Sequence, residues 1–252
     1  MTLNKSIIVS ILSMSLLIGC SSAPEEVTIS NKTTVQEQYE SAKELLESGA
    51  YFQASEILAE LDSRYPFGPH SHQIQLDLIY AYYKMAKSAQ AIASIDRFIR
   101  LNPTHQNIAY VHYMRGLVNY QMAQNAFQEL FGIERFDRDI SKLREAFNDF
   151  KTVIVDHPTS KYANDAKQRM VYLKDFMAKT EIAAAEYYIE RSAWAAAANR
   201  AKYVLETFSD THQIERALEI MVESYGELEL DTLRANTLAT LKTNFPNNPL
   251  VN

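Results

Sequence analysis

The chain of 252 residues contains one cysteine, one tryptophan and only six glycines. A single cysteine excludes any disulfide within the chain. The most apolar run, residues 7–18, is shorter than the roughly 20 residues that a membrane-spanning helix needs. No β-branched run is flanked by turn residues on both sides, which argues against a sheet. These absences favour an all-α fold.

Signatures of catalysis are also missing. The chain has no P-loop, no GxSxG string and no Rossmann glycine motif. The six histidines form no HxxxH or HExxH pair, and His70 and His72 have no third ligand nearby in the sequence. Acidic residues outnumber basic ones by 31 to 25, which argues against general nucleic-acid binding. We therefore expect no enzyme, no cofactor, no metal and no nucleic-acid partner.

The amino terminus is typical of a secreted lipoprotein. Residues 1–19 predict a signal peptide, and they end in Leu17-Ile18-Gly19 followed by Cys20, which resembles the bacterial lipobox. Cys20 is then the acylation site, and several acyl chains give stable attachment to a membrane. Ser21 stands where an aspartate retains lipoproteins in the inner membrane, so sorting to the outer membrane is expected. The alternative is an ordinary secretory signal with a stray cysteine.

Residues 20–34 are polar, contain Pro24 and show no periodicity, which predicts a lipidated flexible tether. The net charge of the chain is −6. Because this charge fits an anionic bilayer poorly, we expect the lipid to be the only link to the membrane. Thr34 and Glu37 then fit a capping box, with which the folded part begins.

A helix–turn–helix pattern recurs along the rest of the chain. Residues 96–101 end one amphipathic helix, Asn102-Pro103-Thr104 stops it, and Ile108 begins another. An alanine stands twelve residues before each of four such turns, and Arg234 takes that place before the fifth. Larger residues mostly occupy the positions four and seven residues after these small positions. The small positions are Ala54, Ala91, Ala146 and Ala197. The positions four residues later are Leu58, Ile95, Phe150, Ala201 and Leu238, and those seven later are Leu61, Phe98, Val153, Val204 and Leu241.

Small residues at this spacing let two helices approach closely, as in the second helix of a tetratricopeptide repeat. We therefore predict a right-handed solenoid of five tetratricopeptide-like helix–turn–helix repeats over residues 35–252. The amino-terminal repeats would occupy residues 35–158 and the carboxy-terminal repeats residues 159–252. An ordinary helical bundle with coincidental spacing is the alternative.

Two stretches are longer than the repeat allows. The distance from Pro103 to Pro158 is 55 residues, against 37 from Pro66 to Pro103. We predict that the extra residues form an ordered, folded-back loop around residues 125–139. Residues 160–191 contain neither proline nor glycine, which predicts one helix of about 30 residues. Two helices with a break near Lys179-Thr180 are the alternative.

Several strings resemble the BamD family, also called YfiO or ComL, over essentially the whole chain. They are YPFGP at 65–69, QLDLIYAYYK at 75–84, DRFIRLNPTH at 96–105, YMRGL at 113–117, FGIERFDRD at 131–139 and the pair Asn199-Arg200. The resemblance implies a non-catalytic lipoprotein scaffold of the β-barrel assembly machine, at the periplasmic face of the outer membrane. Its partners would be the periplasmic domains of BamA, other lipoproteins of the machine and unfolded outer-membrane β-barrel proteins. A repeat lipoprotein that organises peptidoglycan or competence machinery is the alternative.

The aromatic residues of the first repeats suggest a site for the carboxy-terminal peptide of a barrel protein. Such a peptide has a terminal aromatic residue and a free carboxylate, which need an apolar floor and a fixed cation. The floor residues would be Tyr65, Phe67, Tyr80 and Tyr83, and the cations Arg97 and Arg115. In the alternative, these aromatic residues belong to the core and the arginines pair with Asp77 or Asp96.

Asn199 and Arg200 form the string that resembles the partner-binding motif of the family. Arg200 lies near the edge of the helix face that carries Ala197 and Ala201, where a long side chain can reach a partner. Its planar guanidinium suits a carboxylate on BamA. The alternative is an ion pair within the chain, to Glu186 or Glu190.

Overall fold

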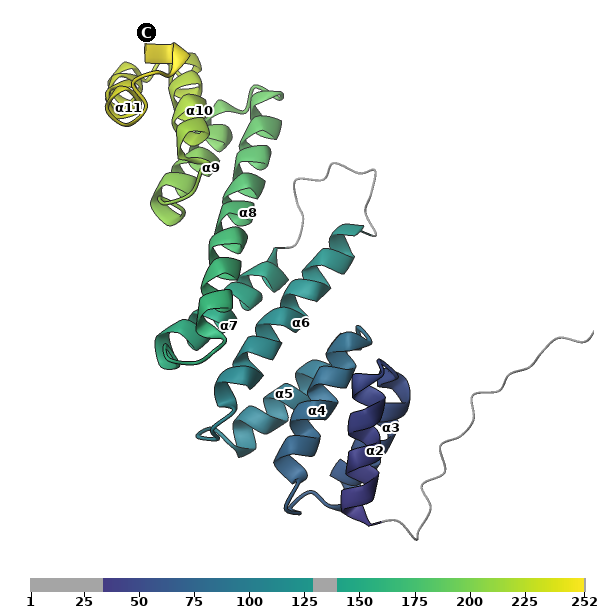
Figure 1. Cartoon of the computed structure of the whole chain (residues 1–252). Helices are drawn as coiled ribbons and strands as arrows, with labels where there is room; N and C mark the ends of the chain where they lie inside the picture. The colour runs from purple at the N-terminus through teal and green to yellow at the C-terminus, as the bar shows by residue number, and fades with distance from the viewer. Residues whose placement is uncertain (1–33, 129–139, 252) are drawn as a thin grey trace, which may run out of the picture.

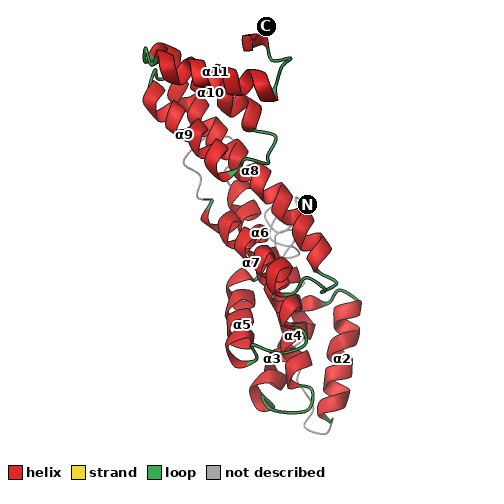
Figure 2. Cartoon of the chain, turned by 90° about the vertical axis from the view of Figure 1, so that its left-hand side faces the viewer, coloured by secondary structure: helices red, strands yellow, loops and turns green. Residues whose placement is uncertain are grey.

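The structure is a computed structural model that describes residues 34–128 and 140–251. Over these two ranges it consists of ten α-helices and one short 3-10 helix, with no strand (Figures 1 and 2). The helices are α2 (Val35–Glu47), α3 (Tyr51–Arg64), α4 (Ser71–Lys84), α5 (Ser88–Leu101), α6 (Ile108–Gln128), α7 (Ser141–Asp156), α8 (Ala163–Ile189), α9 (Trp194–Thr207), α10 (Ile214–Glu227), α11 (Asp231–Asn244) and the 3-10 helix η1 (Pro249–Val251). The predicted all-α fold is therefore confirmed for the described residues.

The helices form an elongated stack in which each helix packs against the next one along the chain. In addition, α4 contacts α6 and α8 contacts α10. Figure 1 shows α2 and α3 at one end of the stack and α10 and α11 at the other, with the long helix α8 running between the two halves. Each helix therefore contacts mainly the helices that directly precede and follow it in the chain.

The folded part begins at the predicted capping box. The Thr34 hydroxyl accepts a hydrogen bond from the Glu37 N–H at 3.2 Å, and the Glu37 carboxylate accepts one from the Thr34 N–H at 2.7 Å. Each side chain thus satisfies a backbone donor that the first turn of α2 leaves open.

The turns inside four of the helix pairs share one backbone geometry. Gly49, Ala86, Ser192 and Glu229 have φ between 54° and 82°, in the left-handed region. After each of them, the next N–H donates to the carbonyl five residues earlier, which is the Schellman arrangement that ends a helix. These bonds join Ala50 to Leu45, Lys87 to Tyr82, Ala193 to Tyr188 and Leu230 to Tyr225.

The turns that follow the helix pairs share a second geometry. The carbonyl of the residue that ends the second helix accepts a hydrogen bond of 3.0 or 3.1 Å from the N–H three residues later. The five bonds join Tyr65 to Gly68, Asn102 to His105, His157 to Ser160, Phe208 to Thr211 and Phe245 to Asn248. Proline follows four of these five cap residues and Ser209 the fifth, as the sequence pattern predicts.

The predicted register of small and large residues is confirmed by burial. Ala54, Ala91, Ala146 and Ala197 are all fully buried. The larger residues four and seven positions later are buried as well, except Leu238, which is partly exposed. Arg234, the departure from the pattern, is exposed on α11.

The predictions for the two long stretches have different outcomes. Residues 160–191 contain a single helix, α8, so the predicted long helix is confirmed and the alternative break near Lys179-Thr180 does not occur. The expected loop around residues 125–139 is wrong at its start, because α6 continues through Gln128 and residues 125–128 are helical. No proline or glycine interrupts the helical pattern there. The remainder, residues 129–139, lies outside the described residues.

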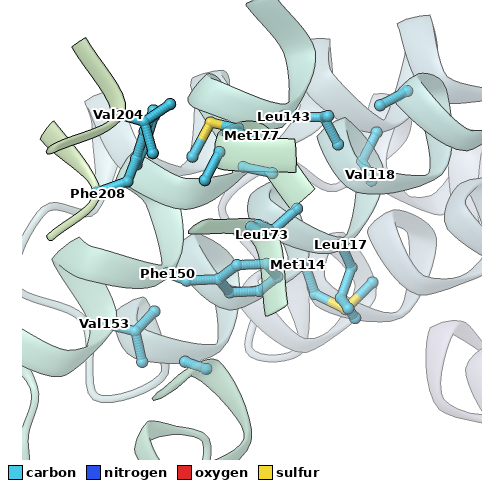
Figure 3. Close-up of a cluster of buried hydrophobic side chains, with 14 of the residues drawn as sticks. Met114, Leu117, Val118, Leu143, Phe150, Val153, Leu173, Met177, Val204 and Phe208 are labelled. Carbon is cyan, nitrogen blue, oxygen red and sulfur yellow. The ribbon is translucent and has the colours of Figure 1, made fainter. Parts of the chain in front are cut away.

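One continuous hydrophobic core runs from α4 to α10, and a smaller one joins α2, α3 and α4. Figure 3 shows the larger core where side chains of α6, α7, α8 and α9 meet, among them Met114, Phe150 and Leu173. Gly116 makes the contact between α6 and α7 possible. A Cβ at this position would lie 2.6 Å from the Phe150 ring, which is closer than packed atoms come.

Candidate binding surfaces

Three carboxylates are buried among the described residues, and each is held by an arginine that the sequence singles out. Asp62, Asp149 and Glu181 have exposed fractions of 8%, 5% and 7%. Their partners are Arg97, Arg115 and Arg200, respectively. All three arginines therefore have a fixed position before any ligand arrives.

Arg97 on α5 pairs with Asp62 on α3 rather than with Asp77 or Asp96. The other oxygen of Asp62 accepts a hydrogen bond of 2.9 Å from the Gln75 amide on α4. This group joins three helices of the first two pairs. The side chain of Arg97 remains 43% exposed, so one side of the guanidinium faces solvent.

Arg115 on α6 bridges two further helices. Its Nε donates to Asp149 on α7 at 2.6 Å, and its Nη1 donates to Asp96 on α5 at 3.4 Å. Asn119 donates to the second oxygen of Asp149 at 2.9 Å. Burial raises the pKa of Asp149, while Arg115 and Asn119 act in the opposite direction. Asp96 is the partner that the sequence suggested for these arginines, and Arg115 does contact it.

Arg200 on α9 donates from Nη1 to Glu181 on α8 at 2.9 Å. This hydrogen bond is the main reason why the pKa of Arg200 is raised, and the Tyr188 hydroxyl contributes in the same sense. The pair lies within the chain, but its acid is neither Glu186 nor Glu190; Glu186 binds Arg216 on α10. The side chain of Arg200 is 46% exposed, and its neighbour Asn199 is exposed as well.

The four aromatic residues that were predicted to form the floor of the peptide site lie at the two ends of the α3–α4 hairpin. Tyr80 and Tyr83 are half-buried near the end of α4, where the Tyr80 ring makes an edge contact with Tyr51 at the start of α3. Tyr65 and Phe67 follow the other end of α3 and are exposed. Since α3 has 14 residues, the two groups are about 20 Å apart. A ligand that touches both must be extended.

The structure adds polar contacts that the sequence did not indicate. The Tyr39 hydroxyl on α2 donates to Asp77 on α4 at 2.7 Å, and burial raises the pKa of both groups. The Tyr113 hydroxyl on α6 donates to Asp165 on α8, whose same oxygen binds Arg169. Tyrosine and aspartate 38 or 52 residues apart carry no local pattern, so only the packing of alternate helices identifies these pairs.

A pocket of about 280 Å³ opens beside the second of these groups, between α6 and α8. It is lined by Tyr120, Phe150, Asp165, Gln168, Arg169, Tyr172 and Leu173.

Over residues 34–128 and 140–251, no three His, Cys, Asp or Glu side chains gather where they could hold a metal ion. Within the same ranges, no helix is both long and apolar enough to cross a membrane.

These features describe an all-α protein of stacked helix pairs whose surface carries exposed aromatic side chains and arginines held in place by buried acids. The family model of YfiO, described as an outer membrane lipoprotein, matches residues 31–241. The chain therefore belongs to the YfiO family of outer membrane lipoproteins.

Relatives from several bacteria carry the name outer membrane protein assembly factor BamD. The protein of Vibrio cholerae is 43% identical over 234 residues, which cover 93% of this chain and 96% of the relative. That of Neisseria gonorrhoeae is 38% identical and covers 91% and 86%, respectively. That of Pasteurella multocida is 39% identical and covers 83% and 80%. The similarity thus extends over nearly the full length of both chains.

Proposed function

We propose that this protein is an outer-membrane protein assembly factor, which acts as a non-catalytic, lipid-anchored scaffold at the periplasmic face of the outer membrane. The observation that carries the proposal is the 43% identity to a BamD protein along 93% of the chain. The scaffold would dock on BamA and the other lipoproteins of the assembly machine. It would receive unfolded β-barrel proteins and pass them on for insertion.

The fold suits a scaffold. We infer that the ten helices make five tetratricopeptide-like repeats, wound as a right-handed solenoid, after a signal peptide (residues 1–19) and a tether (residues 20–34). The two recurring turn geometries and the buried alanines support this division. Repeat proteins of this kind bind partners along extended surfaces, because each repeat contacts only its neighbours.

Capture of the unfolded substrate is assigned to the amino-terminal repeats, residues 35–158. An extended peptide rises by about 3.3 Å per residue, so six residues would reach from Tyr65 to Tyr80 and Tyr83 along α4. Arg97 and Arg115 supply cations near this path. Each is already paired, so a peptide carboxylate would share the guanidinium with a buried aspartate and would not meet an unpaired cation.

Docking on BamA is assigned to the carboxy-terminal repeats, residues 159–252, with Asn199 and Arg200 in the contact. Glu181 engages Nη1 of Arg200, and the half-exposed guanidinium has further donors for a partner's carboxylate. An arginine held in this way loses little side-chain entropy on binding, which favours affinity.

The experiment is co-purification of the full-length protein from detergent-solubilised envelopes. Recovery of BamA and the other lipoproteins of the assembly machine is expected. Recovery of peptidoglycan synthases or sacculi without BamA would instead support the envelope-organising alternative. The purified BamA periplasmic domains, added to the purified protein, then establish whether the contact is direct.

A further inference from the structure

The turns between the first helix pairs lie together along one edge of the molecule. We call residues 65–70, 102–107 and 157–162 the turn edge. The His72 ring, at the start of α4, lies 4.8 Å from the His105 ring in the second turn. Tyr110, at the start of α6, lies 5.5 Å from Tyr162 in the third turn. Each turn therefore adjoins the next one.

The turn edge exposes apolar side chains that the fold does not need. Phe67 is 96% exposed, more than any other large apolar residue described. It stands between Pro66 and Pro69, in a turn closed by the bond from the Gly68 N–H to the Tyr65 carbonyl. Beside the turn edge, Leu101 and Val155, in the last turns of α5 and α7, are each 63% exposed. The ring of Phe67 is thus presented to solvent by a stiff loop.

The charge of this edge differs from that of the whole chain. No aspartate or glutamate occurs in residues 63–76, 97–128 or 157–164, although the net charge of the protein is −6. The exposed Asp156 borders the third turn and is the acid next to it. The same stretches supply the cations Arg64, Arg100 and Lys161 next to the turns. The histidines His70, His72, His105 and His157 also lie there. Arg64 pairs with Glu60 one helical turn back and remains half-exposed.

Aromatic rings beside cations are the combination that favours the headgroup region of a phospholipid bilayer. The ring enters the interface, while the cations meet the phosphates. The net negative charge of the whole chain fits an anionic bilayer poorly, but the cations near these turns favour contact with phosphates at this edge. The edge also differs from the exposed face of α2, where Glu37, Glu40, Glu44 and Glu47 point to solvent.

The first helix of the described residues, α2, begins beside this edge. The Tyr39 ring on α2 stacks on His70 in the first turn at 5.6 Å, so α2 starts next to Phe67's loop. Cys20 precedes Thr34 by 14 residues. Because an extended chain spans at most about 3.5 Å per residue, these residues reach no farther than about 50 Å. A lipid on Cys20 would therefore keep the turn edge near the bilayer.

We propose that the turn edge around Phe67 is a membrane-contact surface, in which the Phe67 ring rests among phospholipid headgroups. The inference rests on the proposed lipid anchor. One ring and a few cations do not hold a protein on a membrane alone, so the lipid attaches the protein and the turn edge orients the solenoid. Phe67 then serves the bilayer, and substrate capture relies on the residues along α4.

The test places a fluorescent reporter at the edge. The only tryptophan, Trp194, begins α9 and is removed by Trp194→Phe. Phe67→Trp is then compared with Phe52→Trp, because Phe52 is also exposed but lies in the first turn of α3, at the opposite end of that helix. The mature chain is coupled through Cys20, its only thiol, to a maleimide lipid in vesicles of phosphatidylethanolamine and phosphatidylglycerol. Chemical coupling makes the test independent of acylation in the cell.

We expect the emission of the tryptophan at position 67 to shift to shorter wavelength and to lose intensity when the lipids carry brominated acyl chains. The reporter at position 52 should change in neither respect. Absence of quenching at position 67, or equal quenching at both positions, would overturn the proposal. So would a shift produced by a barrel carboxy-terminal peptide without lipid, since it would make the loop a peptide site. If Trp194→Phe lowers the melting temperature, Trp194 is retained and the parent emission is subtracted.

Acylation is tested separately by the fractionation of a Cys20 variant in cells. Loss of the anchor with quenching retained would refute only the attachment, and an intact anchor without quenching would refute only the membrane contact.

Discussion

Nη1 of Arg200 lies 2.9 Å from the Glu181 carboxylate, and this contact ties α9 to α8. The acid is almost completely buried, whereas the arginine is half-exposed. The same residue is thus a support of the fold and a candidate contact for BamA, and a single substitution cannot separate the two roles.

The double variant can separate them. Arg200→Leu leaves Glu181 without its charged partner, which should lower the free energy of unfolding by about 1–3 kcal/mol. Glu181→Gln added to Arg200→Leu removes the unpaired charge and should recover much of this loss. If Arg200 contacts BamA, affinity for the BamA periplasmic domains stays low in the double variant. Affinity that returns together with stability would leave Arg200 with a structural role only. Melting curves and titration calorimetry give the two quantities.

The buried alanine of each helix pair should not tolerate a larger side chain. Ala91→Leu overfills the contact between helices and should lower the free energy of unfolding by about 1–3 kcal/mol. Ala93→Leu, two residues further along α5, is the matched control, because Ala93 is exposed and the change should have little effect. Urea denaturation measures both. Equal stability of the two variants would contradict the packing described for Ala91.

A substitution at a turn residue with left-handed backbone conformation should instead raise the stability of the protein. Ala86 has φ of 54°, a conformation that costs a residue with a Cβ about 1–2 kcal/mol. Ala86→Gly removes that cost but adds freedom to the unfolded chain, so a net gain of about 0.5–1 kcal/mol is expected. Ala89→Gly, in the first turn of α5, should instead be destabilising. Thermal unfolding that ranks the two variants the other way would refute the strain at Ala86.

Acid should weaken the fold through His112. Burial, then the nearby Arg115 and His157, lower the pKa of His112 to about 4, and its Nδ1 is buried without a hydrogen-bond partner. Between the ordinary histidine pKa of 6.5 and this value, the unfolded chain binds a proton that the folded chain does not. Stability therefore falls as the pH is lowered through this window.

The His112→Asn variant isolates this contribution. Its melting temperature should decrease less than that of the parent between pH 7 and pH 5. The raised pKa values of Asp77 and Asp149 act in the opposite sense at low pH, but both proteins retain these groups, so their effects cancel in the comparison. Parallel melting curves for the two proteins would exclude His112 as the titrating group.

The proposed lipid anchor predicts where the protein is found in the cell. Cys20→Ala should leave an unacylated protein that separates from the outer membrane when envelopes are fractionated, because its membrane contacts are too few to hold it. The measurement is done in cells depleted of BamA, so that docking does not retain the variant. Quantitative recovery of Cys20→Ala in the outer membrane under these conditions would refute attachment through the lipid.

Local chemistry in the sequence determines much of this protein. The prolines mark where the second helices end, because proline cannot donate the next helical hydrogen bond, and the alanines twelve residues earlier are all buried. The Thr34 capping box and the single helix α8 follow from the same local rules. The strings that resemble BamD are likewise local, and the chain belongs to that family. The predicted loop is wrong at residues 125–128, because extra length does not by itself end a helix and no proline or glycine stops α6 there.

The partners of the charged side chains were decided only by tertiary structure. Asp62 and Arg97 are 35 residues apart, and Asp149 and Arg115 are 34 apart, so their pairing depends on how helices of neighbouring pairs are rotated against each other. The left-handed conformation of Ala86, Ser192 and Glu229 also has no residue signature, since none of them is glycine. It is imposed by the close packing of the two helices that each turn joins. Recurring residues thus indicate where helices begin, end and touch, whereas long side chains find their partners only when the stack is complete.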